Sequence, residues 1–299
     1  MNNSTRKQAM WPHTSLRRLP FAALLRRLRS IRDSYLGHWY TTLATRRLKY
    51  PRVGRPHDLP GELLISLTSY PARFGSLHLT LGCLLDQTVA ADRTTLWIAN
   101  EDFEVLPMQV RELERRGLQI QGCDDLRSFK KLIPALEAYP GAYIVTADDD
   151  VYYRPDWLET LVKAVVVGER TVICHRAHRI RRHAKDRIAP YVQWEMDVRD
   201  AAARKPSANL VPTGVGGVLY PPGALDPMVC DRAQFERLCP DGDDLWFFWM
   251  ARIAGTRHKK VGPKFWQIPW VSTQASALWA TNQAGGNDAM MAALEKEFG

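Results

Sequence analysis

The sequence predicts an α/β fold with a mainly parallel central sheet flanked by helices, preceded by a basic helical N-terminal extension. Hydrophobic residues make up 45% and charged residues 24% of the 299 residues, as in ordinary globular proteins. Strand-like and helix-like segments alternate from residue 63 onward. The basic excess is confined to the start of the chain: residues 1–55 hold 13 Lys or Arg and one acidic residue, and the remainder holds 28 basic and 31 acidic residues.

The extension contains Leu24, Leu25, Leu28 and Ile31 at helical spacing, with arginines between them. Basic amphipathic helices lie on anionic membrane surfaces, although such a helix can also pack on its own domain or contact nucleic acid. We interpret residues 16–49 as a membrane-surface element, with the packing helix as the alternative, and we expect no nucleic-acid partner. The oligomeric state stays open.

The chain has no run of the roughly 18–20 apolar residues that cross a bilayer. We also find no convincing secretory signal. The five cysteines are scattered and contain no C-x-x-C pair, which indicates free thiols in a reducing compartment. We therefore expect a cytoplasmic protein, peripheral at the inner face of the membrane.

Strands and helices alternate in the first half of the chain. The strand candidates are 63–68, 94–99, 118–120 and 142–147, and the helix candidates between them are 76–87, 107–116 and 128–138. This order implies right-handed crossovers and a mainly parallel sheet. The second half contains helix candidates at 158–167, 243–254 and 290–298, a strand at 171–174, and a glycine stretch at 214–217. Residues 191–197 have no assignment.

Three consecutive carboxylates, Asp148–Asp150, directly follow the buried strand candidate 142–147. Their mutual repulsion is relieved by a cation or by solvent. In an extended chain, Asp148 and Asp150 point one way and Asp149 the other. Such a pair at the carboxyl end of a buried strand can hold a hard divalent cation, in the crevice where open α/β sheets bind ligands. The alternative is a solvated turn.

A second acidic pair, Asp243 and Asp244, precedes a very apolar helix. Acidic residues there suit a helix N-terminus, but a carboxylate on a buried stem is also a rigid mount for a general base. An unperturbed Asp is ionised at neutral pH and needs no tuning for this role. We expect Trp246 and Trp249 to be core residues. The glycines at 214–217 fit either a close ligand approach or a tight turn, and they match neither the dinucleotide fingerprint nor a P-loop.

Three further segments complete an ordered series: Ile65–Tyr70 with Arg73, the helix 77–85 followed by Gln87-Thr88, and Lys130–Leu136. The series resembles the nucleotide-sugar-dependent glycosyltransferases of the glycosyltransferase-A fold, especially bacterial family-2-like enzymes of surface polysaccharide (lipopolysaccharide or capsule) assembly. The resemblance covers residues 62–288. It implies a Rossmann-like nucleotide-binding half, with residues 1–58 as the extension and 59–299 as the catalytic domain.

The resemblance also assigns roles to individual residues. Asp148 and Asp150 match the D-x-D motif that binds Mn²⁺ or Mg²⁺ on the sugar diphosphate. Asp244 supplies the catalytic base, with Asp243 as the close alternative. The residues implied to contact the nucleotide-sugar donor are Thr68, Tyr70, Arg73, Lys131, Asp148, Asp149, Gly216 and Gly217.

The implied activity is metal-dependent transfer of a single sugar, with inversion, to a glycan or lipid-linked acceptor. Single transfer is favoured because the Q-x-x-R-W motif of processive synthases is absent. No metal-binding histidine is evident, and we expect His258 at the surface. Two other classes stay open: a sugar-nucleotide nucleotidyltransferase, disfavoured because the loop 68–73 lacks glycines, and a non-catalytic membrane-associated binding protein.

Overall fold

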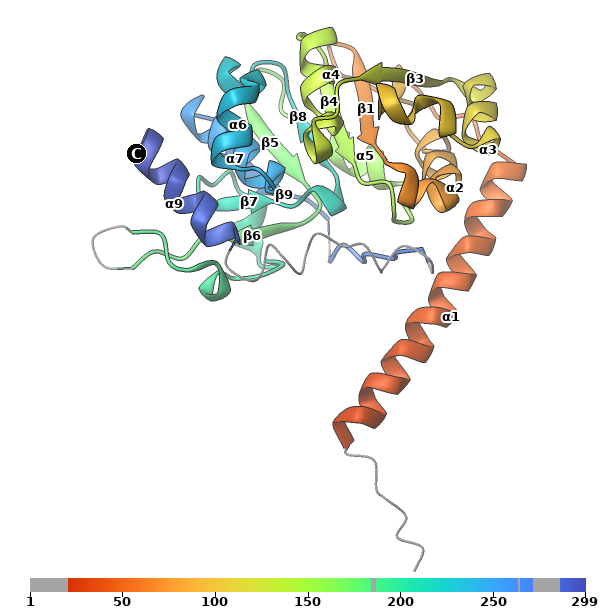
Figure 1. Ribbon diagram of the computed structural model, residues 1–299, viewed down its shortest axis with the longest axis horizontal. Coiled ribbons are helices and arrows are strands. Elements are labelled where there is room, and N and C mark those ends of the chain that lie inside the picture. Colours follow the sequence, from red (N-terminus) through yellow and green to blue (C-terminus); the bar gives the residue numbers. More distant parts are fainter. Residues whose placement is uncertain (1–20, 184–186, 263, 271–285) are drawn as a thin grey trace, which may run out of the picture.

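The computed structural model describes residues 21–183, 187–262, 264–270 and 286–299 (Figure 1). A seven-stranded sheet in the order β3-β2-β1-β4-β8-β5-β9 forms its centre. The strands are β1 (Leu63–Thr68), β2 (Arg93–Ala99), β3 (Leu118–Cys123), β4 (Tyr143–Ala147), β5 (Thr171–Cys174), β8 (Val218–Tyr220) and β9 (Arg257–Lys260). Every neighbouring pair is parallel except those of β8, which runs antiparallel to both β4 and β5. The predicted fold class is confirmed.

Helices cover both faces of this sheet, and alternate strand residues therefore enter two separate cores. In β1, Leu64 packs in one core and Ile65 in the other, and Ile144 and Val145 of β4 divide in the same way. Strands buried on both faces explain why these segments are continuous apolar runs in the sequence. The helices around the sheet are α2 (Phe74–Leu85), α3 (Met108–Arg111), α4 (Ile133–Ala138), α5 (Trp157–Val162), α6 (Arg232–Leu238), α7 (Asp243–Ile253) and α9 (Asn287–Phe298).

The extension forms one long helix, α1 (Phe21–Lys49), which projects from the domain and meets it only near its C-terminal end (Figure 1). There Ala44 is buried, and the Leu48 side chain packs against Gly82 of α2. The buried Arg47 guanidinium forms an ion pair with Asp86, 2.5 Å from Nε to Oδ2. It also donates to the carbonyl oxygen of Tyr153 at 2.6 Å. The packing alternative therefore holds for this end of the helix.

No helix in the described ranges is long and apolar enough to cross a membrane. Residues 16–20 of the predicted basic helix lie outside the described residues. All five cysteines are free, as expected.

Several predicted helices are shorter than expected. The segment 107–116 becomes α3 followed by a 3₁₀ turn at Glu112–Arg116, and 128–138 becomes a 3₁₀ turn at Arg127–Lys131 followed by α4. Pro134, at the start of α4, lacks the N–H that a continuous helix would need, so the helix begins again there. Residues 191–193 form a short 3₁₀ turn.

Five of the labelled helices and strands have no counterpart in the sequence predictions: α6, β8, β9, and the small second sheet of β6 (Ala177–Arg179) and β7 (Leu210–Pro212). β9 has the basic sequence Arg-His-Lys-Lys, which shows no strand-like apolar pattern. The expectation that His258 lies at the surface is wrong, because it is 1% exposed and its ring centre lies 5.1 Å from that of Phe248. A strand partner on one side and a helix on the other bury a residue whose sequence context is cationic.

Candidate active site

The two acidic motifs meet at the carboxyl end of β4, around the ammonium group of Lys131. Lys131 Nζ lies 2.7 Å from Asp243 Oδ2, 3.4 Å from Asp148 Oδ1 and 3.7 Å from Asp244 Oδ1. Burial lowers the pKa of Lys131, but the three carboxylates outweigh burial and hold that pKa well above its ordinary value. Lys131 is therefore a permanent cation that joins residues almost one hundred positions apart.

Lys131 is held in place through its backbone. The Ser66 hydroxyl of β1 donates to the Lys131 carbonyl oxygen at 2.6 Å. The indole N–H of Trp97 in β2 donates in turn to Ser66 Oγ at 2.9 Å. A fixed main chain on two central strands aims the ammonium group at the sheet edge. The resemblance implied that this lysine contacts the nucleotide, and the structure shows that it is buried.

Asp244 and Asp243 occupy different environments although they are adjacent. The Gly214 N–H donates to both carboxylate oxygens of Asp244, at 3.1 and 3.0 Å, and 35% of the Asp244 side chain is exposed. The Asp243 side chain is 12% exposed and pairs with Lys131. Asp244 is therefore the more accessible of the two carboxylates, and Asp243 is the more buried.

Removal from water is the largest effect on Asp244. It raises the pKa of Asp244 to about 7, helped by the charge of Asp243 and opposed by Lys131 and the Gly214 N–H. The expectation that this carboxylate works without tuning is therefore wrong. A pKa near neutrality suits a group that must take up a proton during the reaction.

Asp149 and Asp150 converge on Arg73, which follows β1. Arg73 Nη1 lies 3.0 Å from Asp149 Oδ1 and 2.5 Å from Asp150 Oδ2. The Ser69 hydroxyl also donates to Asp149 Oδ2 at 2.5 Å. The expected alternation, with Asp149 pointing away from Asp150, is wrong because β4 ends at Ala147 and the chain bends at this pair.

The D-x-D carboxylates fit a hard divalent cation. Asp148 and Asp150 keep 30% and 16% of their side chains exposed, so their oxygens are accessible. Burial and the charge of Asp148 raise the pKa of Asp150 to about 6, and a cation would relieve this repulsion. No cluster of three or more His, Cys, Asp or Glu with metal-site geometry occurs in the described part of the chain. A magnesium-type ion takes one or two carboxylates plus substrate phosphates, so this pair suffices.

The glycine stretch forms the wall opposite Asp148. A Cβ added to Gly214 would lie 2.4 Å from Lys131 Nζ, 3.1 Å from Asp244 Oδ1 and 3.3 Å from Asp148 Oδ1. At Gly217, with φ of +88°, a Cβ would lie 2.4 Å from the Trp157 ring. The Trp157 indole N–H fixes this loop by donating to the carbonyl oxygen of Gly216 at 2.8 Å. Of the three glycines in this stretch, Gly214 lies closest to the acidic cluster, and the sequence analysis did not select it as a donor contact.

Thr68 and Tyr70 lie at the end of β1, next to Arg73. The Thr68 hydroxyl donates to the carbonyl oxygen of Trp97 at 2.8 Å. The Tyr70 side chain is 38% exposed, and the Arg73 guanidinium lies 5.6 Å from its ring centre. Tyr70 therefore presents an accessible aromatic face beside the aspartates, and its role in binding a nucleotide stays a prediction.

Three residues that support Asp148–Asp150 were not predicted. The Asp148 N–H donates to the Tyr153 hydroxyl oxygen at 2.8 Å. The Thr80 hydroxyl donates to the carbonyl oxygen of Asp149 at 2.8 Å. The Trp270 indole N–H donates to Thr80 Oγ1 at 2.7 Å. No local motif marks Thr80 or Trp270, because each reaches the aspartates only through the folded chain.

No family model matches the sequence, and no curated protein matches it. Matches among solved structures include S. aureus TarS 1–349, with 13% identity over 67% of this chain and 59% of that chain and a TM-score of 0.40. The chain thus spans less than two thirds of that structure. They also include the 4-diphosphocytidyl-2C-methyl-D-erythritol synthase from Anaerococcus prevotii. That match has 13% identity over 75% of this chain and 97% of that chain, with a TM-score of 0.43. A third is the inositol-1-phosphate CTP transferase from T. maritima, with 8% identity over 79% of this chain and 98% of that chain and a TM-score of 0.34. Likeness at this level does not identify a function.

Proposed function

We propose that the protein is a metal-dependent glycosyltransferase that moves one sugar from a nucleotide diphosphate sugar to a glycan or lipid-linked acceptor. The observation that carries the proposal is the convergence of Asp148, Asp243 and Asp244 on Lys131. A D-x-D pair for the diphosphate and a separate carboxylate of near-neutral pKa for the acceptor hydroxyl are the two parts that an inverting transfer needs.

The protein residues divide this chemistry between them. Asp244, open to solvent and held by the Gly214 N–H, would accept the proton of the acceptor hydroxyl as the new glycosidic bond forms. Arg73 and Lys131 stay positively charged and would orient the diphosphate by charge. Because Gly214 has no side chain, Lys131 and Asp244 can lie close to the backbone there.

Asp148 and Asp150 would hold the Mn²⁺ or Mg²⁺ ion. When bound, such an ion supplies Lewis-acid stabilisation of the charge that develops on the leaving diphosphate. Asp149 is tied to Ser69 and Arg73, and it would keep Arg73 aligned with the donor.

The N-terminal helix supports a membrane-linked acceptor. α1 contains seven Lys or Arg and one acidic residue, and its Tyr35 and Trp39 side chains are 70% and 54% exposed. Aromatic and basic residues together favour an anionic membrane surface. The α1 ribbon meets the domain near its C-terminal end and projects away from it before that (Figure 1). Liposome flotation with and without residues 1–40 tests it: unchanged partition after the deletion would contradict membrane binding.

A panel of nucleotide sugars incubated with the protein and Mn²⁺ tests the activity. We expect sugar transfer or slow donor hydrolysis that releases a nucleoside diphosphate and disappears in Asp150→Ala. Turnover that consumes or releases pyrophosphate would instead identify a nucleotidyltransferase. Binding of donors without any turnover would support the non-catalytic alternative.

A further inference from the structure

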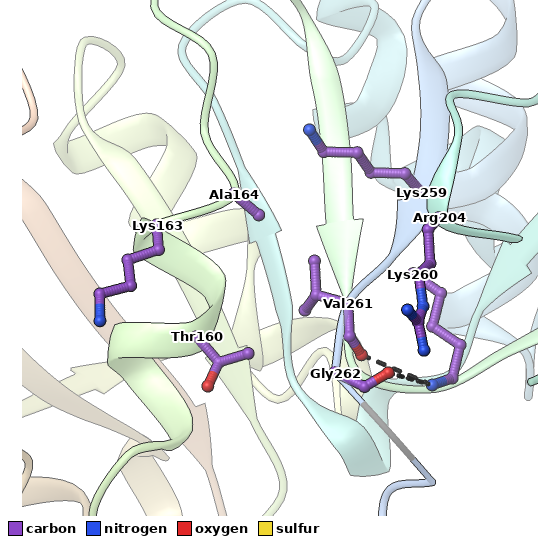
Figure 2. A pocket seen from close by; sticks show the side chains of 8 residues that line it. All are labelled: Thr160, Lys163, Ala164, Arg204, Lys259, Lys260, Val261 and Gly262. Atoms are coloured by element: carbon purple, nitrogen blue, oxygen red, sulfur yellow. Dashed lines mark hydrogen bonds between the residues drawn. The ribbon is translucent and has the colours of Figure 1, made fainter. Parts of the chain in front are cut away.

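A second, cationic cavity lies beside the proposed active site, at the carboxyl end of β9. It has a volume of about 480 Å³ and is lined by Thr160, Lys163, Ala164, Arg204, Lys259, Lys260, Val261 and Gly262. Figure 2 shows the Arg204 and Lys260 side chains together on one side, and Thr160 and Ala164 on the α5 side. The Lys259 side chain extends away from these two cations. The lining contains no carboxylate, so the cavity carries a strong positive charge.

Lys260 is a buried cation in the lining of this cavity. It is 3% exposed, and its ammonium group donates to the carbonyl oxygens of Val261 and Gly262 at 3.5 and 3.4 Å. Burial lowers the pKa of Lys260; Cys174 and Asp197 oppose this effect, and the positive charges of Arg204 and Arg199 add to it. A bound anion would reverse this repulsion. Lys163 contributes least, because its ammonium group pairs with Glu159 at 2.6 Å and extends away from the other cations (Figure 2).

The cavity belongs to a wider basic surface. Residues 176–205 contain nine Lys or Arg and four acidic residues, and residues 257–264 contain four Lys or Arg and no acidic residue. Residues 56–299 as a whole have slightly more acidic than basic residues. Basic residues are therefore enriched in the two sequence segments that contain Arg204, Lys259 and Lys260.

The strand register connects the cavity with the active site. Thr146 pairs with Val218, Val218 with Cys174, and Cys174 with Lys260, so the four residues form one row across the sheet. Asp148 and Gly262 each lie two residues beyond this row, toward the same edge. Three interstrand steps separate them by roughly 14 Å.

One side chain separates the cavity from the glycine stretch. His175 is buried, and its Nε2 lies 2.9 Å from the carbonyl oxygen of Trp157. Its Cβ would lie 3.3 Å from a Cβ at Gly216, and its Nδ1 would lie 3.7 Å from a Cβ at Gly262. The cavity is thus next to the loop that borders the acidic cluster, on the side away from Arg73.

We propose that this cavity binds an oxyanion of the acceptor, a phosphate or carboxylate group attached to the glycan that receives the sugar. The proposal rests on the proposed glycosyltransferase function and names the class of its acceptor as anionic. The cavity cations favour a negatively charged acceptor over a neutral one. The acceptor would span the distance between the two sites, with its anionic group in the cavity and its reacting hydroxyl near Asp244.

Direct binding tests the cavity without relying on sugar transfer. Inorganic phosphate and glucuronate are titrated into the full chain in EDTA by calorimetry, with glucose as the neutral probe. EDTA removes metal ions that could hold an anion at Asp148–Asp150. Any anion held by Arg73 or Lys131 would bind equally well to the cavity variants. The double variant Arg204→Gln/Lys259→Gln removes two cavity cations without touching the buried Lys260. Lys205→Gln, an exposed neighbour outside the cavity lining, is the matched control.

We expect at least one anion to bind, glucose not to bind, and the double variant to weaken anion binding at least about tenfold while Lys205→Gln leaves it unchanged. If only phosphate binds, the anionic group of the acceptor is a phosphate; if only glucuronate binds, it is a carboxylate. Absence of binding by both anions, or equal weakening in the double variant and the control, would overturn the proposal. Release of a nucleoside diphosphate from the nucleotide-sugar panel with Mn²⁺ is measured on the wild type: it is present if only the cavity proposal is wrong, and it is absent if the proposed function is wrong.

Discussion

At the scale of single residues, the site depends on a position without a side chain. Gly214 lies where Lys131, Asp148 and Asp244 come closest, and its N–H holds the Asp244 carboxylate. A methyl group there would displace the Lys131 ammonium or the carboxylates around it. The displacement would change the electrostatic balance of the whole cluster.

Gly214→Ala is therefore expected to lower kcat/KM about a hundredfold, because shifts of about 1 Å in catalytic groups have effects of this size. The measurement is steady-state kinetics with the donor found in the panel. Gly75→Ala is the matched control, because a Cβ at Gly75 in α2 meets no atom within 4 Å. Equal activity of the two variants would show that the space at Gly214 is not needed.

At the scale of elements, hydrogen bonds and an ion pair of Arg47 anchor α1 to the domain. Its guanidinium contacts Asp86 and the carbonyl oxygens of Cys83, Asp86 and Tyr153. Tyr153 in turn accepts the Asp148 N–H. The end of the extension is thus connected to the D-x-D segment through one residue.

Arg47→Met is expected to destabilise the protein by about 3 kcal/mol, because it leaves Asp86 buried without its main partner. Urea unfolding followed by circular dichroism measures the change. Arg46→Met, one residue earlier on an exposed position of α1, should stay within about 0.5 kcal/mol of wild type. If Arg47→Met were as stable as Arg46→Met, the fastening role of Arg47 would be wrong.

The elements also show what a sequence can and cannot predict. β1, β2, β4 and β5 were recognisable because both of their faces are buried, which produces long apolar runs. β9 was not, because its basic residues are buried by neighbours that come from elsewhere in the chain. The same limit applies within the site.

Local patterns identified the aspartates of the site but not the groups that hold them. Asp148–Asp150 and Asp243-Asp244 stand out in the sequence as carboxylates next to apolar segments. The burial of Lys131, the Gly214 contact and the bend at Asp149 depend on how distant segments pack, and no local pattern reports packing.

At the scale of the whole molecule, buried histidines make stability depend on pH. Burial lowers the pKa of His258 to about 3 and those of His175 and His178 to about 4. In the unfolded chain these imidazoles bind a proton below about pH 6.5. Since the folded chain resists protonation, the stability present above pH 6.5 is lost as the pH falls toward the folded values.

His258→Leu is expected to reduce this acid sensitivity. Between about pH 7.5 and about pH 5, the wild type should lose about 2 kcal/mol more of its free energy of unfolding than the variant, from the His258 imidazole alone. Urea titrations at the two pH values measure the difference. His38→Leu, on α1, should behave as wild type, and an unchanged pH dependence in His258→Leu would contradict the buried neutral state.

The central claim is that the two acidic motifs form one transfer site with separate tasks. The most direct measurement compares nucleotide binding and nucleoside diphosphate release in wild type, Asp150→Ala and Asp244→Asn, with Mn²⁺ and the active donor. We predict that Asp150→Ala loses both metal-dependent binding and release, while Asp244→Asn binds the nucleotide normally and releases at least a hundredfold more slowly. Release at the wild-type rate by Asp244→Asn, or metal-dependent binding that survives Asp150→Ala, would contradict the account.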